Sequence, residues 1–229
     1  MDLPAILDAD HVDGAAGLLH RYYTQKLTSG HVRTGARFDT WAGGGDSPGA
    51  ANRITADDLV ALALLGEDIK GPAVLGLLET KAPEIGELLE LIPVGLELAD
   101  VAAVEYVHVL GKDSPAWLLW DLFRGYRGGQ WKMGATKASK LLARKRPKLI
   151  PIWDSMVARS IGAGTSLTQW EEWHALLTAK DRELVRRLDT VQDLAALPVR
   201  ISALRAMDVV LWMDAKQRGF RAVPGDDDG

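Results

Sequence analysis

The chain has no cysteine among its 229 residues. Disulfides, cysteine-ligated zinc and thiolate-held iron–sulfur clusters are therefore excluded. The five histidines are scattered, with no pair at i, i+4 spacing: His11, His20, His31, His108 and His174. Without such a pair the sequence predicts no metal site, and no other motif calls for a cofactor.

Long hydrophobic runs are also missing. The longest, such as Leu59–Leu65, are far shorter than the roughly 20 apolar residues that cross a bilayer as a helix. Residues 1–14 are acidic and lack the basic flank and apolar centre of a signal peptide. We therefore expect a cytoplasmic protein without a membrane partner, which the absence of cysteine also fits.

Strand patterns are absent as well, because no stretch alternates repeatedly between apolar and polar residues. The sequence predicts an all-α fold of about nine to eleven helices in one domain, residues 1–220, built of two helical lobes. Residues 221–229 are predicted to be a disordered tail. The segment 97–110 is compatible with either helix or strand.

Capping residues and prolines set the expected helix boundaries. Thr55 and Asp154 are predicted N-caps, Ser114-Pro115 opens another helix, and Gly125 and Gly162 are predicted ends. The expected helices are 14–27, 56–65, 72–79, one starting at 83, 115–124, 133–145, 155–161, 167–178, 181–196 and 199–217.

A glycine-rich segment, residues 28–53, is the longest loop candidate, and it contains the triplet Gly43–Gly45. A phosphate-binding loop would need a strand before the glycines and a Lys-Ser or Lys-Thr pair after them, and neither is present. We expect a surface loop, and the role of residues 39–53 is left open.

Basic residues concentrate between Leu122 and Trp170, where Asp154 is the only acid. This window carries a charge of +9 in a chain of net charge −4, so the remainder carries −13. Such sorting of charge favours an anionic partner. The ten cations are Arg124, Arg127, Lys132, Lys137, Lys140, Arg144, Lys145, Arg146, Lys148 and Arg159.

The order of residues in this window resembles the helix–hairpin–helix DNA glycosylase superfamily. The resembling residues are the segment from Gly134 to Lys137, then Asp154 seventeen residues after Lys137, preceded by the run Ile150-Pro-Ile-Trp153. The resemblance covers roughly residues 125–165, with the helix–hairpin–helix element at about 115–162. The segment 38–62 is in addition similar to a family of uncharacterised actinobacterial proteins, to which the whole chain is expected to belong.

The superfamily resemblance implies a DNA repair hydrolase that releases a damaged or modified base from double-stranded DNA. It implies that Asp154 is the catalytic carboxylate and that Gly134 lies in the phosphate-binding hairpin. Lys137 occupies the position of an optional nucleophile, which would add AP-lyase activity. Two departures are that only one hairpin glycine matches and that Met156 stands where histidine is common.

The residue types suit this chemistry. A base inside a duplex must be flipped out, at a cost of a few kcal/mol, and cleavage of its glycosidic bond builds positive charge on the sugar that a carboxylate stabilises. Trp131 would stack on or wedge into DNA. The residues expected to hold phosphates are Lys132, Lys140, Arg144, Lys145, Arg146 and Lys148.

Simpler interpretations compete with each of these roles. Asp154 alone would serve as an N-cap, Lys137 as a solvated helix lysine or a phosphate contact, and the basic run as a solvated helix end. The alternative functions are a non-catalytic helix–hairpin–helix nucleic-acid-binding protein and a helical protein that binds an acidic partner protein. The lesion, the oligomeric state and any cation at the hairpin are not encoded in recognisable motifs.

Overall fold

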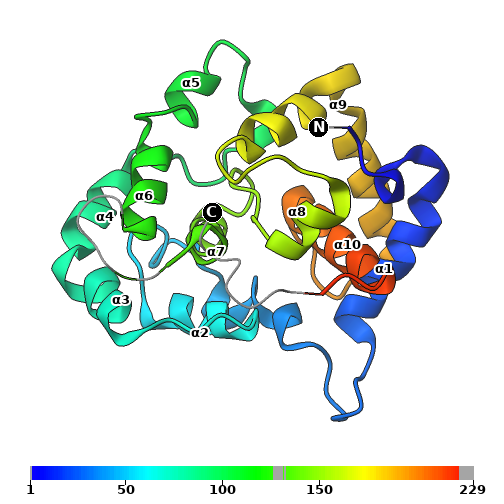
Figure 1. The fold of residues 1–229 in the computed structure, drawn as a ribbon, viewed down its shortest axis with the longest axis horizontal. Coiled ribbons are helices and arrows are strands. Elements are labelled where there is room, and N and C mark those ends of the chain that lie inside the picture. Colours follow the sequence, from blue (N-terminus) through cyan, green and yellow to red (C-terminus); the bar gives the residue numbers. More distant parts are fainter. Residues whose placement is uncertain (1, 126–130, 132, 222–229) are drawn as a thin grey trace.

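The computed structural model describes residues 2–125, 131 and 133–221, and every regular element in this part is helical (Figure 1). The all-α prediction is therefore confirmed. The α-helices are α1 (Val12–Thr24), α2 (Ala56–Leu64), α3 (Gly71–Leu75), α4 (Ala82–Glu90), α5 (Tyr106–Val109), α6 (Pro115–Arg124), α7 (Ala135–Lys145), α8 (Ser155–Ile161), α9 (Gln169–Ala195) and α10 (Ala203–Gln217).

The predicted caps are confirmed. Thr55 and Asp58 form a capping box at the start of α2, and the Ser114 hydroxyl accepts a hydrogen bond from the Trp117 N–H. Gly125 and Gly162 end α6 and α8 in the left-handed conformation, at φ values of 87° and 64°. These boundaries were readable from sequence because each depends on residues within one helical turn.

Some boundaries differ from the prediction. The helix expected over 72–79 is divided into α3 and a π-helical turn, Gly76–Thr80. The ambiguous segment 97–110 contains only a 3-10 turn, Leu98–Asp100, and the short α5. Within α9 the helix is interrupted at residues 179–182, which agrees with the two helices expected there.

The helices pack in two groups. Helices α2, α3, α4 and α6 lie with α7 on one side of Figure 1, and α1, α8, α9 and α10 lie on the other. One hydrophobic cluster continues through both, from Leu89 and Trp120 in the first group to Leu188 and Val210 in the second. The extended run before α8 therefore joins the two groups and carries Asp154 between them.

Candidate functional site

Asp154 caps α8, as predicted. Its Oδ1 atom accepts hydrogen bonds from the backbone N–H groups of Met156 (3.0 Å) and Val157 (3.2 Å). The run before it is anchored on both sides, because the Ser139 hydroxyl accepts the Trp153 N–H (2.9 Å) and the Gln169 amide donates to the Ile152 carbonyl (2.6 Å). The carboxylate is thus held in a fixed position by α7, α8 and α9.

The Asp154 side chain opens into a cavity of about 490 Å³, hereafter the Asp154 cavity. This volume lies within the range typical of small-molecule sites, and 17% of the Asp154 side chain is exposed. Tyr22 and Trp212 contribute aromatic walls whose ring centres lie 5.9 Å apart, edge to face. The other lining residues are Leu27, Ser29, His31, Val32, Arg33, Thr34, Gly35, Leu64, Leu65, Gly66, Lys140, Arg205, Asp208 and Val209.

Two cations lie beneath this cavity, and each faces two carboxylates. Lys140 pairs with Glu67, and its Nζ lies 3.8 Å from Asp154 Oδ2. Lys140 and Asp154 line the cavity, and Glu67 lies behind Lys140.

The second cation is Arg205, which pairs with Asp39 at 3.0 Å and with Asp208. It also donates to the Gly35 carbonyl at 3.0 Å, so it is firmly held between α10 and the segment after α1. Its side chain is only 5% exposed. A surplus of negative charge in so shielded a place favours a guest that is cationic, or that becomes cationic during reaction.

Burial shifts the protonation of two groups here. Burial acts to lower the pKa of the Lys140 ammonium, but the carboxylates of Glu67 and Asp154 outweigh it, so the pKa lies above its usual value. Burial raises the pKa of the Asp208 carboxyl to about 6, against the opposing influence of Arg205. Lys140 is therefore a permanent cation beside Asp154, and Asp208 gains or loses its proton near pH 6.

The raised pKa of Asp208 makes stability depend on pH. Between its ordinary pKa of 3.8 and about 6 the folded chain binds more protons than the unfolded chain, so this group's contribution to stability falls as pH rises. The loss amounts to about 3 kcal/mol. Asp208→Asn mimics the protonated carboxyl. We expect its free energy of unfolding, measured with urea, to rise relative to that of the wild type by this amount between pH 4 and pH 7.

The matched control is Asp214→Asn, which removes a carboxylate from the same helix at a site where it pairs with the half-exposed Arg218. Its stability is expected to follow the wild-type pH profile in that range. A constant difference between Asp208→Asn and wild type across pH 4–7 would contradict the prediction.

The structure brings only part of the predicted site to Asp154. Lys140 lines the Asp154 cavity, whereas Lys137, one turn earlier on α7, is half-buried and is not among its lining residues. Gly134 is the N-cap of α7. Lys132, most of the predicted hairpin (residues 126–130) and residues 222–229 of the predicted tail lie outside the described residues.

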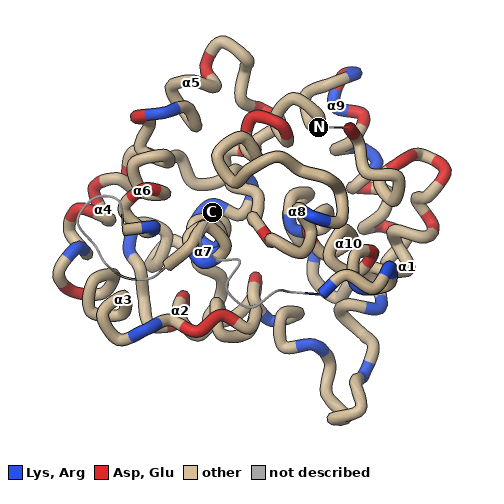
Figure 2. The backbone as a smooth tube through the Cα atoms, viewed as in Figure 1, with Lys and Arg blue, Asp and Glu red and all other residues tan. Residues whose placement is uncertain are grey.

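Four of the predicted phosphate contacts are instead buried: Lys140, which is 6% exposed and pairs with Glu67, and the run from Arg144 to Arg146. Arg144, Lys145 and Arg146 are at most 3% exposed. Arg144 and Lys145 pair with Asp58 at 3.3 and 2.9 Å. The prediction that these side chains contact phosphate is therefore corrected, because their donors are taken up by the chain's own acceptors. Figure 2 shows the Lys and Arg positions of α7 and the Asp and Glu positions of α2.

Backbone carbonyls bind the two arginines of this run. Arg144 donates to the carbonyls of Phe38, Asp39 and Trp41. Arg146 donates to the carbonyls of Leu89, Ile92, Ala51 and Lys145 and to the Asn52 side chain. Each guanidinium thus closes a loop of the first helix group onto α7.

The structure also corrects the predicted role of Trp131 and leaves that of Lys148 as a prediction. Trp131 is 7% exposed and lies against Gly76, where a Cβ atom would come within 2.2 Å of the indole, so it is a packing residue rather than a stacking platform for DNA. Lys148 is half-exposed and pairs with Glu97 at 3.0 Å. Its predicted role in phosphate binding stays a prediction.

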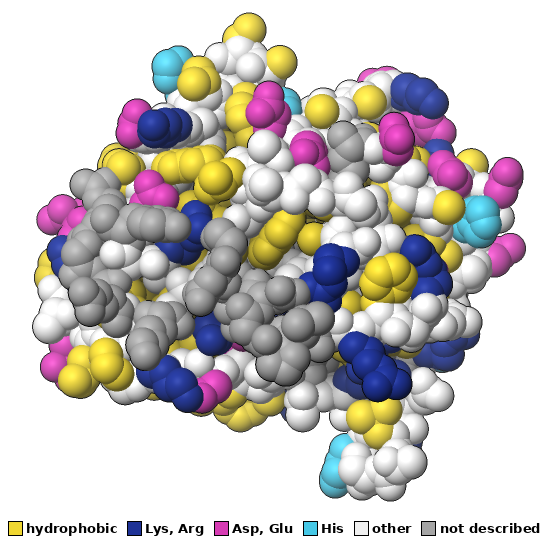
Figure 3. Space-filling model, in the orientation of Figure 1, with side chains coloured by type: hydrophobic (Ala, Val, Ile, Leu, Met, Phe, Trp, Pro, Cys, Tyr) yellow, Lys and Arg dark blue, Asp and Glu magenta, His cyan; other side chains and the backbone are white. Residues whose placement is uncertain are grey.

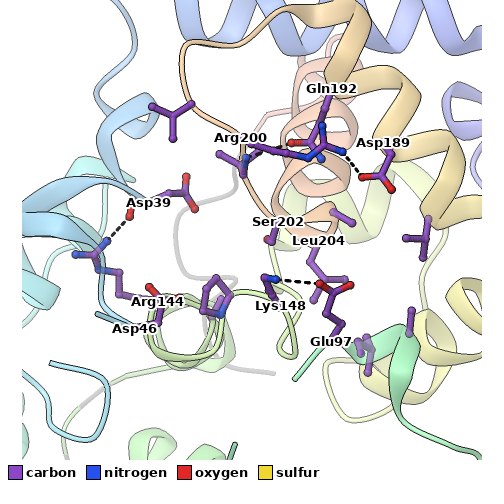
Figure 4. A pocket seen from close by; sticks show the side chains of 18 of the residues that line it. Asp39, Asp46, Glu97, Arg144, Lys148, Asp189, Gln192, Arg200, Ser202 and Leu204 are labelled. Atoms are coloured by element: carbon purple, nitrogen blue, oxygen red, sulfur yellow. Dashed lines mark hydrogen bonds and ion pairs between the residues drawn. The ribbon is translucent and has the colours of Figure 1, made fainter. Parts of the chain in front are cut away.

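A second cavity, of about 510 Å³, is lined by the C-terminal end of α7 and the residues that follow it (Figure 4). Two ion pairs lie within its lining: Lys148 with Glu97, and Arg200 with Asp189 (2.5 Å). Gln192 accepts the Ile201 N–H. Since these two cations are already paired with carboxylates of the same cavity, it is a weaker candidate than the Asp154 cavity.

The glycine-rich segment forms part of the wall of this second cavity and packs against α7. A Cβ atom on Gly45 would come within 2.4 Å of the Arg144 carbonyl oxygen. Gly45 thus permits a close approach of two backbones. The segment packs against Arg144, so part of residues 39–53 has a structural role.

The most informative residues of the site escaped the sequence analysis. Asp208 and Trp212 sit on α10, and Tyr22 sits on α1, far from the basic window in sequence. Trp212 shows the apolar spacing of an ordinary core residue. Only the packing of α1 against α10 makes these side chains neighbours of Asp154.

Comparisons with known proteins identify a family without a function. A model described as a family of unknown function (DUF6308) matches residues 15–215, which confirms the expected membership of an uncharacterised family. No curated protein and no solved structure matches the chain. The glycosylase resemblance has no counterpart among these findings and stays a prediction. Within the described residues, no helix combines the length and the hydrophobicity that a membrane crossing requires.

Proposed function

Because the chain belongs to this family of unknown function, we propose its function from the Asp154 cavity: it hydrolyses the N-glycosidic bond of a damaged or modified nucleotide flipped out of double-stranded DNA. The base would enter the cavity alongside the paired rings of Tyr22 and Trp212. The sugar would lie at Asp154, whose carboxylate is the catalytic group.

The chemistry follows from the charge that the reaction creates. As the bond from C1′ to the base nitrogen breaks, its electron pair leaves with the base and the sugar becomes an oxocarbenium-like cation. Asp154 stabilises this cation and orients the water that attacks C1′. The products are a free base, which takes up a proton, and an abasic site.

One observation carries the proposal: a fixed carboxylate opens into an aromatic-walled cavity, and the two buried cations beneath it face four carboxylates, of which Asp154 and Asp208 line the cavity. Lys140 touches this carboxylate, yet its raised pKa keeps it protonated and hence non-nucleophilic. A lyase step would therefore have to use another amine, such as Lys137.

A panel of duplexes tests the activity. Each carries one deaminated, oxidised or alkylated base, and base release is detected as strand cleavage after alkali, with the unmodified duplex as control. We expect an abasic product from at least one class of lesion. If no duplex yields an abasic product while all of them bind, the alternative function is supported, namely a nucleic-acid-binding protein without catalysis.

That alternative rests on the capping role of Asp154. Two backbone N–H groups and Lys140 already surround the carboxylate, and a cap stabilises its helix by roughly 1 kcal/mol. The alternative predicts salt-dependent DNA binding and no change in the DNA after incubation.

A further inference from the structure

Cations lie at the Asp154 cavity and beside it. Arg33 lines the cavity and donates to the Arg21 carbonyl. Lys216 lies over the ring of Trp212, with its Nζ 4.7 Å from the ring centre, and Trp212 is a wall of the cavity. These side chains come from α1, the segment after it, and α10.

The same cationic surface continues onto α8. Arg218 donates to the Ser160 carbonyl (3.0 Å), and Arg159 donates to the Arg221 carbonyl (2.8 Å). Figure 3 shows Lys and Arg side chains gathered on this face, between the end of α10 and the protruding segment that follows α1. We call Arg21, Arg33, Arg159, Lys216 and Arg218 the basic rim.

The rim differs from the basic run of α7 in its availability. Among the described residues, neither Arg33 nor Lys216 lies within ion-pair distance of a carboxylate, and Lys216 is exposed. Arg144, Lys145 and Arg146 are buried and bonded internally. Arg33 and Lys216 are thus able to meet an anionic partner, whereas Arg218 also pairs with Asp214.

The sign of the charge changes between rim and interior. Arg33 lies at the mouth, whereas beneath the cavity Lys140 and Arg205 face four carboxylates: Asp154 and Asp208 in the lining, and Glu67 and Asp39 behind it. An acidic protein segment would meet repulsion at the floor. A nucleotide matches both zones, because its phosphates stay outside while its sugar and base enter.

We infer that the basic rim binds the sugar–phosphate backbone of double-stranded DNA on either side of the nucleotide that enters the Asp154 cavity. The inference rests on the proposed function for the identity of the partner and adds the surface that holds it. Each phosphate neutralised releases condensed counterions, so binding is expected to weaken steeply with salt.

The test is fluorescence anisotropy with a short labelled duplex of undamaged DNA, titrated over a range of salt concentrations. We expect Arg33→Ala/Lys216→Ala to bind about tenfold or more weakly at about 0.1 M salt and to lower the slope of log K against log salt by about two. The matched control, Lys112→Ala/Lys180→Ala, removes two exposed lysines that do not line the cavity, and we expect it to bind like wild type.

The outcomes separate this inference from the proposed function. Loss of binding in the rim variant, with no base release by wild type on any lesion, supports the rim and contradicts the glycosylase. Equal loss in both double variants, a larger loss in the control, or no duplex binding by wild type overturns the rim. If the wild type binds single-stranded DNA more tightly than the duplex, and the rim variant loses that binding, the assignment to duplex DNA is overturned.

Discussion

Asp154→Asn is expected to lower the rate of base release by about a thousandfold, while leaving the affinity for undamaged duplex and the stability of the fold nearly unchanged. The amide has the shape of the carboxylate but not the charge that stabilises the sugar cation. Asparagine is also a favoured N-cap, so α8 keeps its first turn. The measurement is single-turnover base release on the duplex that the panel identifies.

A second readout of this variant does not depend on knowing the lesion. Wild type is expected to bind a duplex with a cationic pyrrolidine at the abasic position more tightly than one with the neutral tetrahydrofuran. Asp154→Asn is expected to lose most of this preference. Equal binding of the two duplexes by wild type would show that Asp154 does not face a developing cation. Asp46→Asn, in the loop beside the second cavity, serves as the control.

Asp58→Ala is expected to destabilise the fold by about 3–5 kcal/mol, because it removes one partner of a buried ion cluster. The Asp58 side chain, 1% exposed, faces Lys145 and Arg144 and also accepts hydrogen bonds from the Thr55 N–H and hydroxyl. The alanine variant leaves two buried cations without a carboxylate and α2 without its capping box. Urea unfolding measures the loss.

Asp57→Ala is the matched control, since Asp57 occupies the same first turn but is exposed and bonds only to the Trp41 indole in the described structure. The free energy of unfolding of this variant is expected to fall by no more than about 1 kcal/mol. Burial lowers the pKa of Lys145, and Asp58 opposes this shift. Without Asp58 the Lys145 pKa falls further, so the deficit is expected to narrow as pH rises. Equal losses in both variants would refute the structural role of the cluster.

The basic run of α7 explains where sequence reasoning succeeds and where it stops. Its helical periodicity and its ending before Pro147 are local properties, and the predicted helix is present. Whether its charged side chains point into the protein or into solvent depends on partners distant in sequence. Asp58 lies 86 residues before Arg144, and the Phe38 carbonyl lies 106 residues before it. A row of cations without acids nearby in sequence therefore resembles a binding surface for a polyanion. In the folded chain, however, acids that are distant in sequence contact these cations.

Asp154 shows the opposite case. Its cap was predictable because the accepting and donating groups are two and three residues apart. That it faces a cavity depends on α10, whose Trp212 and Asp208 carry no local signature of a site. The most telling contacts of the site thus come from residues that sequence patterns assign to an ordinary helical core.

The walls of the Asp154 cavity come from both ends of the described chain, Tyr22 near its start and Trp212 near its finish. During synthesis a ribosome must therefore complete α10 before the site exists at all. An unfinished chain carries Asp154 with one side open to water. The cavity at Asp154 is therefore completed late, when α10 docks against α1.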